Sequence, residues 1–297
     1  MGLTRVLGGV AAAGLAYSVW ETRWFVERRI TVPGVLEPGA KPLRILHVSD
    51  LHLTPHQQRK RQWVAQLDSL APDLVVSTGD NLAHPRAVPA ALAAHGRLLD
   101  RPGVFVFGSN DYFSPRLKNP AKYLLGGTGV NNDGPWDRIP DLPVEDLRAA
   151  FTGHGWLDLN NAHGALVVAE RQLAFVGVDD PHLELDELDH QPADASAALA
   201  IGVTHAPYRR VLDRWTSLGY PLILAGHTHG GQLRVPGLGA LVTNCDLPRR
   251  FASGLHRHVL GASQSSWVHV SAGLGTSPYT QVRFCCRPEA TLLTLTG

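Results

Sequence analysis

Five short polar motifs, each placed directly after an apolar run, constrain this chain more than any other feature of its sequence. The apolar runs have the length of buried strands. The motifs are Asp50-Leu51-His52, Gly79-Asp80-Asn81, Gly108-Ser109-Asn110-Asp111, Thr204-His205 and the run from Gly226 to Gln232. In open α/β sheets, functional groups gather just past the carboxyl ends of the strands. The sequence therefore predicts that these five segments meet at one edge of an α/β fold.

Strand-length and helix-length segments alternate through the first part of this region. Strands are predicted over residues 43–48, 74–77 and 104–107, with helices over 57–70 and 88–99 between them. This alternation favours βαβ units. From residue 157 the chain becomes richer in strands. Further strands are predicted over 165–168, 173–178, 200–203, 221–225, 267–270 and 290–296, with a helix over 208–218.

The first 29 residues differ from the rest of the chain. Residues 6–20 carry no charged side chain, and the aromatic residues Trp20, Trp24 and Phe25 follow. Aromatic side chains of this kind mark membrane interfaces, although the run is shorter than the roughly 20 residues of a spanning helix. A signal anchor, a cleaved signal peptide and an amphipathic surface helix are the alternatives. The absence of a convincing cleavage site favours a retained anchor. Residues 1–29 are therefore expected to associate the protein with a membrane, on a side that the flanking charges do not define. Residues 30–42 are expected to be a linker or a first edge strand, and residues 43–297 the catalytic domain.

Composition excludes several classes of function. The chain has 297 residues, 44% of them hydrophobic, which is enough for a large core. Its formal net charge is +1 and no basic tract is interleaved with aromatic residues, so dedicated nucleic-acid binding is not expected. The three cysteines, Cys245, Cys285 and Cys286, contain no CxxC pair, which argues against a thiolate zinc site.

The residue types in the five motifs suit divalent metals. In Asp50-Leu51-His52 the two polar side chains are two positions apart, so an extended backbone directs both to one side. Carboxylate, amide and imidazole groups without thiolate suit Mn, Fe or Zn. Two such ions about 3.5–4 Å apart activate water and stabilise a phosphoryl transition state. Each motif alone has a structural explanation, such as a helix cap at Asp50 or a turn at Asp80, but their recurrence at five strand ends favours a dinuclear hydrolase.

The motifs Ser49-Asp50-Leu51-His52 and Gly226 to Gln232 resemble those of the calcineurin-like metallophosphoesterase superfamily, in its membrane-associated bacterial branch. The resemblance covers residues 43–297. It implies a fold of two stacked mixed β-sheets flanked by helices, in four αββα layers. It also implies two metal-ligand sets that share one carboxylate. These sets are Asp50, His52, Asp80 and His229 for one ion, and Asp80, Asn110, His205 and His227 for the other.

The third motif departs from the family pattern. Where the family usually has Gly-Asn-His-Asp, this chain has Gly108-Ser109-Asn110-Asp111. Without a gap Ser109 falls on the ligand position, whereas a shift of one residue places Asn110 there. We prefer the shift, because an amide carbonyl is a better ligand for a hard metal than a hydroxyl. The histidine that commonly assists the leaving group is absent. Asp111 and His182 are the candidates for the general acid, with a turn residue as the alternative for His182.

The resemblance implies hydrolysis of phosphoric ester or pyrophosphate bonds by a metal-bound hydroxide. A phosphodiester or a lipid-linked substrate is expected. Alternatives are a phosphomonoesterase acting on phosphoproteins or small phosphates, a nuclease, and a non-catalytic scaffold with this fold.

Three further segments are expected near the substrate. Residues 114–142 are rich in proline and glycine and hold the apolar run 123–125, which suggests a flap or insert that favours a lipid substrate. Arg249 and Arg250 are expected to receive a phosphate group, with a solvated surface pair as the alternative. The glycine-rich segment 271–277 is expected at the edge of the cleft.

Overall fold

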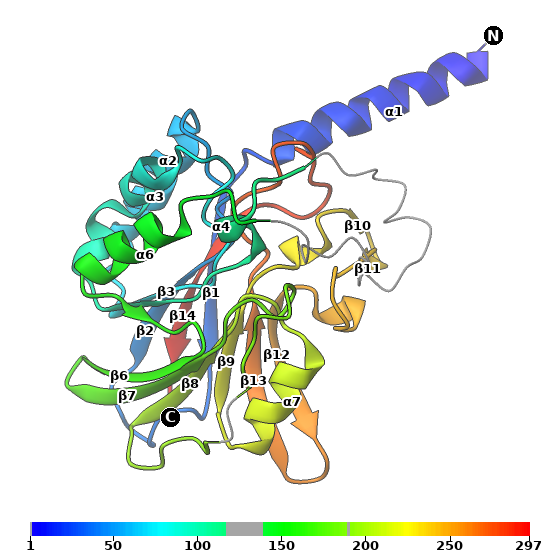
Figure 1. Cartoon of the computed structure of the whole chain (residues 1–297). Coiled ribbons are helices and arrows are strands. Elements are labelled where there is room, and N and C mark those ends of the chain that lie inside the picture. The colour runs from blue at the N-terminus through cyan, green and yellow to red at the C-terminus, as the bar shows by residue number, and fades with distance from the viewer. Residues whose placement is uncertain (1, 117–138, 189–190) are drawn as a thin grey trace.

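Two six-stranded sheets lie face to face, and helices cover their outer faces (Figure 1). The computed structural model describes residues 2–116, 139–188 and 191–297. The four layers follow the order αββα, which confirms the predicted fold class. Residues 117–138 of the predicted flap lie outside the described part of the chain.

The first sheet is mixed. It contains, in spatial order, β1 (Val26–Val32), β14 (Glu289–Leu295), β2 (Leu43–Val48), β3 (Leu74–Ser77), β4 (Gly103–Phe105) and β5 (Leu157–Asp158). Strands β2 to β5 are parallel neighbours, whereas β14 runs antiparallel to β2. The connections between the parallel strands are α2 (Gln58–Gln66) with η1 (Leu67–Leu70), α3 (Val88–His95) with η2 (Gly96–Asp100), and α6 (Val144–Gly153). The predicted helices 57–70 and 88–99 thus exist, but each ends in a 3₁₀ turn, as is frequent at helix termini.

The second sheet is also mixed. It contains, in spatial order, β12 (Gly254–Leu260), β13 (Gln264–Val270), β9 (Leu222–Ala225), β8 (Leu199–Val203), β7 (Arg171–Gly177) and β6 (Ala162–Val168). The four central strands are parallel, and an antiparallel hairpin closes each edge. Helix α7 (Arg209–Ser217) joins β8 to β9 and packs on the outer face. Smaller elements near the site are α4 (Ser109–Tyr112), η4 (His229–Gly231), β10 (Arg234–Val235), β11 (Gly239–Ala240) and η5 (Arg249–Phe251).

Neighbouring side chains of the central strands enter different cores. Ile45 and Val76 pack between the two sheets, whereas Leu46 and Val75 pack beneath the helices of the first sheet. Successive side chains of a strand point to opposite faces. A strand that is covered on both faces is therefore apolar at nearly every position, which explains the continuous apolar runs in the sequence.

The N-terminal helix α1 (Gly2–Glu21) projects from the body of the molecule (Figure 1). Strand β1 starts at Val26 and pairs with β14 along its whole length. Residues 26–32 therefore form an edge strand of the first sheet, which extends across the predicted boundary at residue 29. The charged side chains of Glu27, Arg28 and Arg29 hide this strand from a hydropathy pattern, because an edge strand tolerates charge. Among the described residues, no helix has both the length and the hydropathy needed to cross a bilayer.

His95 is a buried imidazole in the core beneath the helices of the first sheet. Its Nδ1 atom lies 2.9 Å from the carbonyl oxygen of Ala91, and Nε2 has no partner. The rings of Phe151 and Trp156 pack against it edge to face. Burial lowers the pKa of His95 to about 4. Because this value lies below that of the unfolded chain, the folded state loses stability as the pH falls from about 6.5 toward 4.

Replacing His95 with leucine should remove this part of the acid sensitivity. Between pH 8 and pH 5 the wild-type protein should lose about 2 kcal/mol more free energy of unfolding than His95→Leu. The measurement is urea unfolding of both proteins at the two pH values, comparing the changes with pH rather than the absolute stabilities. Equal losses in the two proteins would show that His95 is not held neutral by the core.

Candidate metal centre

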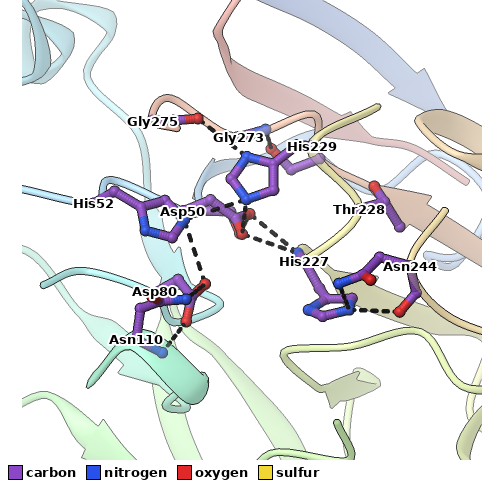
Figure 2. A network of polar contacts seen from close by, with 12 residues as sticks. Asp50, His52, Asp80, Asn110, His227, Thr228, His229, Asn244, Gly273 and Gly275 are labelled. Carbon is purple, nitrogen blue, oxygen red and sulfur yellow. Dashed lines mark hydrogen bonds and ion pairs between the residues drawn. The ribbon is translucent and has the colours of Figure 1, made fainter. Parts of the chain in front are cut away.

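The structure brings together all seven side chains that are predicted as metal ligands. Asp50 and His52 follow β2, Asp80 follows β3, Asn110 lies on α4 after β4, His205 follows β8, and His227 and His229 follow β9. The carboxyl ends of the parallel strands in both sheets face the same edge, so loops from both sheets meet there (Figure 2).

The first group is compact. Ligand atoms of Asp50, His52, Asp80 and His229 all lie within 4.8 Å of one another. The Nε2 atom of His52 lies 3.3 Å from Asp80 Oδ2 and 3.2 Å from His229 Nε2. His229 Nε2 lies 3.6 Å from Asp50 Oδ1. These four residues are the set that the resemblance assigns to one ion.

The second group begins at the other oxygen of the Asp80 carboxylate. Asp80 Oδ1 lies 3.6 Å from His205 Nε2 and accepts a hydrogen bond of 2.7 Å from the backbone N–H of Asn110. The side-chain amide of Asn110 donates to Asp80 Oδ2 over 2.8 Å. His227 Nδ1 lies 3.3 Å from His205 Nε2. Asp80 therefore stands between the two groups, and the Asn110 amide, rather than the neighbouring Ser109 hydroxyl, is the group directed at it.

Hydrogen bonds to backbone carbonyls fix the tautomers of three imidazoles. His205 Nδ1 lies 2.7 Å from Thr78 O, His229 Nδ1 lies 3.0 Å from Gly275 O, and His227 Nε2 lies 3.1 Å from Asn244 O. A carbonyl oxygen only accepts, so each of these nitrogens carries the proton. The other nitrogen of each neutral ring then presents a lone pair to the centre. This is the arrangement found around metal ions, where the outer hydrogen bond orients the ligand.

Two of these lone pairs face each other. His205 Nε2 and His227 Nδ1 are 3.3 Å apart in a buried site, and neither has a proton in the neutral tautomers. Two lone pairs at this distance repel unless a proton or a metal ion lies between them. The residues present therefore fit a bound cation, and the carboxylates beside them fit a divalent one.

The electrostatics of the site favour the same conclusion. Burial lowers the pKa values of His227 and His229 well below the usual range, and that of His52 to about 4. Burial alone would raise the pKa of Asp80, but His205 and His52 hold it well below its usual value. Burial alone would lower the pKa of His205, but Asp80 and nearby carboxylates raise it to about 9. An ionised carboxylate among imidazoles attracts either a proton or a metal ion, and the two compete for one place.

The backbone at the centre is held in an uncommon conformation. Five of the ligand residues have positive φ angles between 43° and 69°: Asp50, His52, Asp80, His227 and His229. This left-handed region costs a non-glycine residue about 1–3 kcal/mol. Such strain persists only where the surrounding structure over-determines it. The loops therefore hold these side chains directed at the centre.

Glycines allow the loops to approach closely. A Cβ atom at Gly226 would lie 1.9 Å from Ser49 Oγ and 2.7 Å from Asp50 Oδ2. At Gly108 it would lie 2.5 Å from Asp80 Oδ1. Neither glycine has a positive φ angle, so close packing rather than backbone conformation excludes a side chain at these two positions.

Asp111 holds two of the loops together. Its fully buried carboxylate accepts backbone N–H groups of Asp80, Asn81 and Gly108 at 2.8, 2.8 and 3.1 Å. Burial raises the pKa of Asp111 to about 7. The carboxylate does not line the cavity of the site, so a role as general acid does not fit this position. Asp111 instead positions the backbone that carries Asp80.

His182, the other general-acid candidate, reaches the site. It lines the cavity, and its ring centroid lies 4.5 Å from that of His227. Its Nδ1 atom lies 3.0 Å from the Tyr208 hydroxyl. A ligand in the cavity can therefore contact this ring.

Arg249 and Arg250 do not line the cavity. The Arg249 guanidinium donates to Leu241 O, and that of Arg250 stacks on the Phe251 ring. Both side chains are exposed on η5, which favours the surface-pair alternative over phosphate binding. Arg116, which carried no motif signal, lines the cavity instead.

Sequence reasoning also missed Arg283. This buried guanidinium donates to the carbonyl oxygens of Ala272, Gly273 and Gly275, and so fixes the glycine-rich loop against the metal centre. The same loop supplies the Gly275 carbonyl to His229. No local pattern in the sequence singles out this arginine, because most of its partners are backbone oxygens.

The cavity over the centre has a volume of about 270 Å³. Its polar lining includes His52, Asp80, Asn110, His182 and His227. Four apolar side chains also line it: Leu233, Leu241, Val242 and Val282. The space can therefore hold a ligand with one polar and one apolar part.

Comparison with known proteins gives a consistent result. The family model described as calcineurin-like phosphoesterase matches residues 43–231. The chain is 30% identical to phosphodiesterase YaeI of Escherichia coli (strain K12) over 96% of this chain and 93% of that protein. It is 26% identical to metallophosphoesterase YkoQ of Bacillus subtilis (strain 168) over 86% and 84%. The solved structure of TT1561 of Thermus thermophilus aligns with a TM-score of 0.43 at 14% identity, over 79% of this chain and 91% of that one.

Replacing Gly226 with alanine should disturb the centre through contact alone. The new Cβ atom collides with Ser49 and Asp50, so we expect a loss of about 1–3 kcal/mol in stability and less than half of the wild-type metal content after reconstitution. Elemental analysis and thermal unfolding measure the two effects. Gly153→Ala is the matched control, because a Cβ atom there meets nothing within 4 Å. If Gly226→Ala binds as much metal as this control, the close approach does not matter for the ligands.

Proposed function

Because the chain belongs to the calcineurin-like phosphoesterase family, we propose that this phosphoester hydrolase cleaves phosphodiester or pyrophosphate bonds with the help of two divalent metal ions. The observation that carries the proposal is the position of Asp80. One of its oxygens faces His52 and the other faces His205, so a single carboxylate serves both ligand groups.

The residues assigned to each ion follow from this position. Asp50, His52, Asp80 and His229 would hold one ion, and Asp80, Asn110, His205 and His227 the other. Oxygen and nitrogen donors without thiolate suit Mn, Fe or Zn. When bound, two such ions lower the pKa of water and offset charge on the phosphoryl oxygens.

His182 is proposed to give a proton to the leaving oxygen. Within the described lining of the cavity, it is the one imidazole or carboxylate outside the seven ligand residues. The hydrogen bond to Tyr208 orients its ring beside the centre. Asn110 and Arg116 line the same space and can contact the phosphoryl oxygens of a substrate.

A diester with a lipid part is the proposed substrate class. The apolar lining of the cavity supports it, and so does helix α1, whose exposed apolar side chains suit a membrane anchor. The Escherichia coli relative is named a phosphodiesterase, which favours diesters over monoesters. A long-chain phosphodiester should therefore be cleaved faster than its short-chain analogue, and equal rates would contradict the lipid part of the proposal.

The variant Asp80→Ala tests the shared carboxylate. Metal-reconstituted wild-type protein should hydrolyse bis(p-nitrophenyl) phosphate faster than p-nitrophenyl phosphate. Asp80→Ala should lose roughly a thousandfold in kcat/KM on the diester, because both ion sites lose a ligand. Asp194→Ala, which changes an exposed carboxylate, is the control. Wild-type turnover by Asp80→Ala would contradict the two-metal proposal.

The variant His182→Gln tests the proton donor. Nitrophenolate leaves without a proton, so its release should slow by less than about threefold. An alkyl leaving group needs the proton, so its release should slow by about a hundredfold. Steady-state kinetics on aryl and alkyl diesters gives both numbers. An equal loss on both substrates would indicate that His182 acts on the metal centre through its neighbour His227 and not on the leaving group.

A further inference from the structure

Six exposed or half-exposed apolar side chains gather beside the mouth of the cavity. They come from the end of α1, from the β10–β11 hairpin and from the segment 277–284. We call this surface the apolar rim: Trp20, Trp24, Leu233, Val235, Leu238 and Tyr279. Leu238, at the tip of the hairpin, is 70% exposed. In Figure 1, α1 and the hairpin lie in the upper right of the molecule, well away from the β12–β13 turn at the bottom.

Direct contacts join the three segments into one surface. The Tyr17 ring packs edge to face on Phe284 at 5.5 Å, and Arg283 N–H donates to Ser18 O. The backbone N–H of Arg234 donates to Phe284 O, which ties the hairpin to the same segment. The Gln232 amide donates to Thr280 O and Val282 O. Leu233, Thr280 and Val282 also line the cavity, so the rim continues into the site.

The exposed charge beside the rim is basic: Arg28, Arg234 and Arg287 are exposed or half-buried, whereas Glu21 and Glu289 in the same region are buried. Residues 230–288 contain one acidic side chain, Asp246. The same stretch contains six arginines: Arg234, Arg249, Arg250, Arg257, Arg283 and Arg287. This excess is local, because the net charge of the whole chain is only +1. Two of these arginines do not add to the charge beside the rim, because Arg283 is fully buried and Arg257 lies on β12. A basic and apolar surface complements anionic headgroups above a hydrocarbon layer.

We propose that the apolar rim docks on an anionic lipid surface, with the β10–β11 hairpin entering the interface and the cavity mouth facing the lipid. Trp and Tyr side chains favour the headgroup level, and each basic residue close to such a surface adds to the attraction. A contiguous exposed apolar patch marks an interaction site. This contact adds a second membrane-binding element to α1, and it does not depend on the proposed hydrolysis.

Paired substitutions test the docking on the full-length protein. Val235→Asp/Leu238→Asp changes the hairpin without touching the lining of the cavity. Val167→Asp/Val259→Asp changes two valines of similar exposure, 73% and 63%, near the β6–β7 and β12–β13 turns. Binding to vesicles of phosphatidylcholine and phosphatidylglycerol should weaken at least tenfold for the hairpin pair and less than twofold for the control pair. Equal weakening in both pairs would overturn the proposal.

Helix α1 alone could keep every variant bound to the vesicle and mask the effect of the hairpin. A dye attached at the hairpin measures its insertion directly. Cys285 is the exposed cysteine, so Cys285→Ser provides a background for labelling. A polarity-sensitive dye on Leu238→Cys should shift to the blue on anionic vesicles, and the same dye on Val259→Cys should not. No shift at position 238 would exclude insertion of the hairpin.

Two further outcomes separate this proposal from its rivals. Suppose that wild-type protein sediments as an oligomer, that the Val235→Asp/Leu238→Asp variant sediments as a monomer, and that vesicles bind no wild-type protein. The rim is then a contact between copies of the chain, and the lipid proposal fails. Hydrolysis is followed in parallel on soluble bis(p-nitrophenyl) phosphate. Vesicle binding without hydrolysis would leave the docking intact and remove the proposed diesterase function.

Discussion

Two imidazole lone pairs directed at each other, on His205 and His227, are the constraint on which the rest of this structure depends. The two rings follow β8 and β9 of the second sheet, while the carboxylate of Asp80 beside them follows β3 of the first. A proton on His205 or a metal ion relieves their repulsion, so the seam between the two sheets favours a positive charge inside it. The backbone N–H of His227 donates to Asp50, which closes the same seam from the other side.

The strain in the loops is the cost of this arrangement. Five ligand residues have positive φ angles, which disfavour folding locally. At Gly108 and Gly226 the loops approach so closely that no side chain fits. These features persist because a buried strand fixes the start of every loop and because Asp111 accepts backbone N–H groups of the Asp80 loop. Arg283 fixes the neighbouring 272–275 segment through its carbonyl oxygens. The surrounding structure therefore fixes the orientation of these side chains.

The sequence predicts the seven ligand residues well and the residues that hold them in place poorly, for physical reasons. Strands β3, β8 and β9 are buried at every position and β2 at all but Arg44, so their runs are mainly apolar and their ends are visible. The ligand side chains follow these ends directly. Asp111 lies in a motif, but only the fold shows that its oxygens face backbone N–H groups and not a substrate. Arg283 carries no pattern, because most of its partners are backbone carbonyls. Strand β1 is visible only in part, as an edge strand within 30–42, because its first residues are charged.

One segment connects the metal centre to the surface of the molecule. Gly275 O fixes the tautomer of His229, and Arg283 holds that carbonyl in place. Between these two residues the chain carries Tyr279 to the apolar rim and bonds to Gln232 through Thr280 and Val282. A change in the position of Tyr279 at the rim can therefore move the loop whose Gly275 carbonyl orients His229. The proposed docking surface and the proposed metal centre are therefore joined by one segment of the chain.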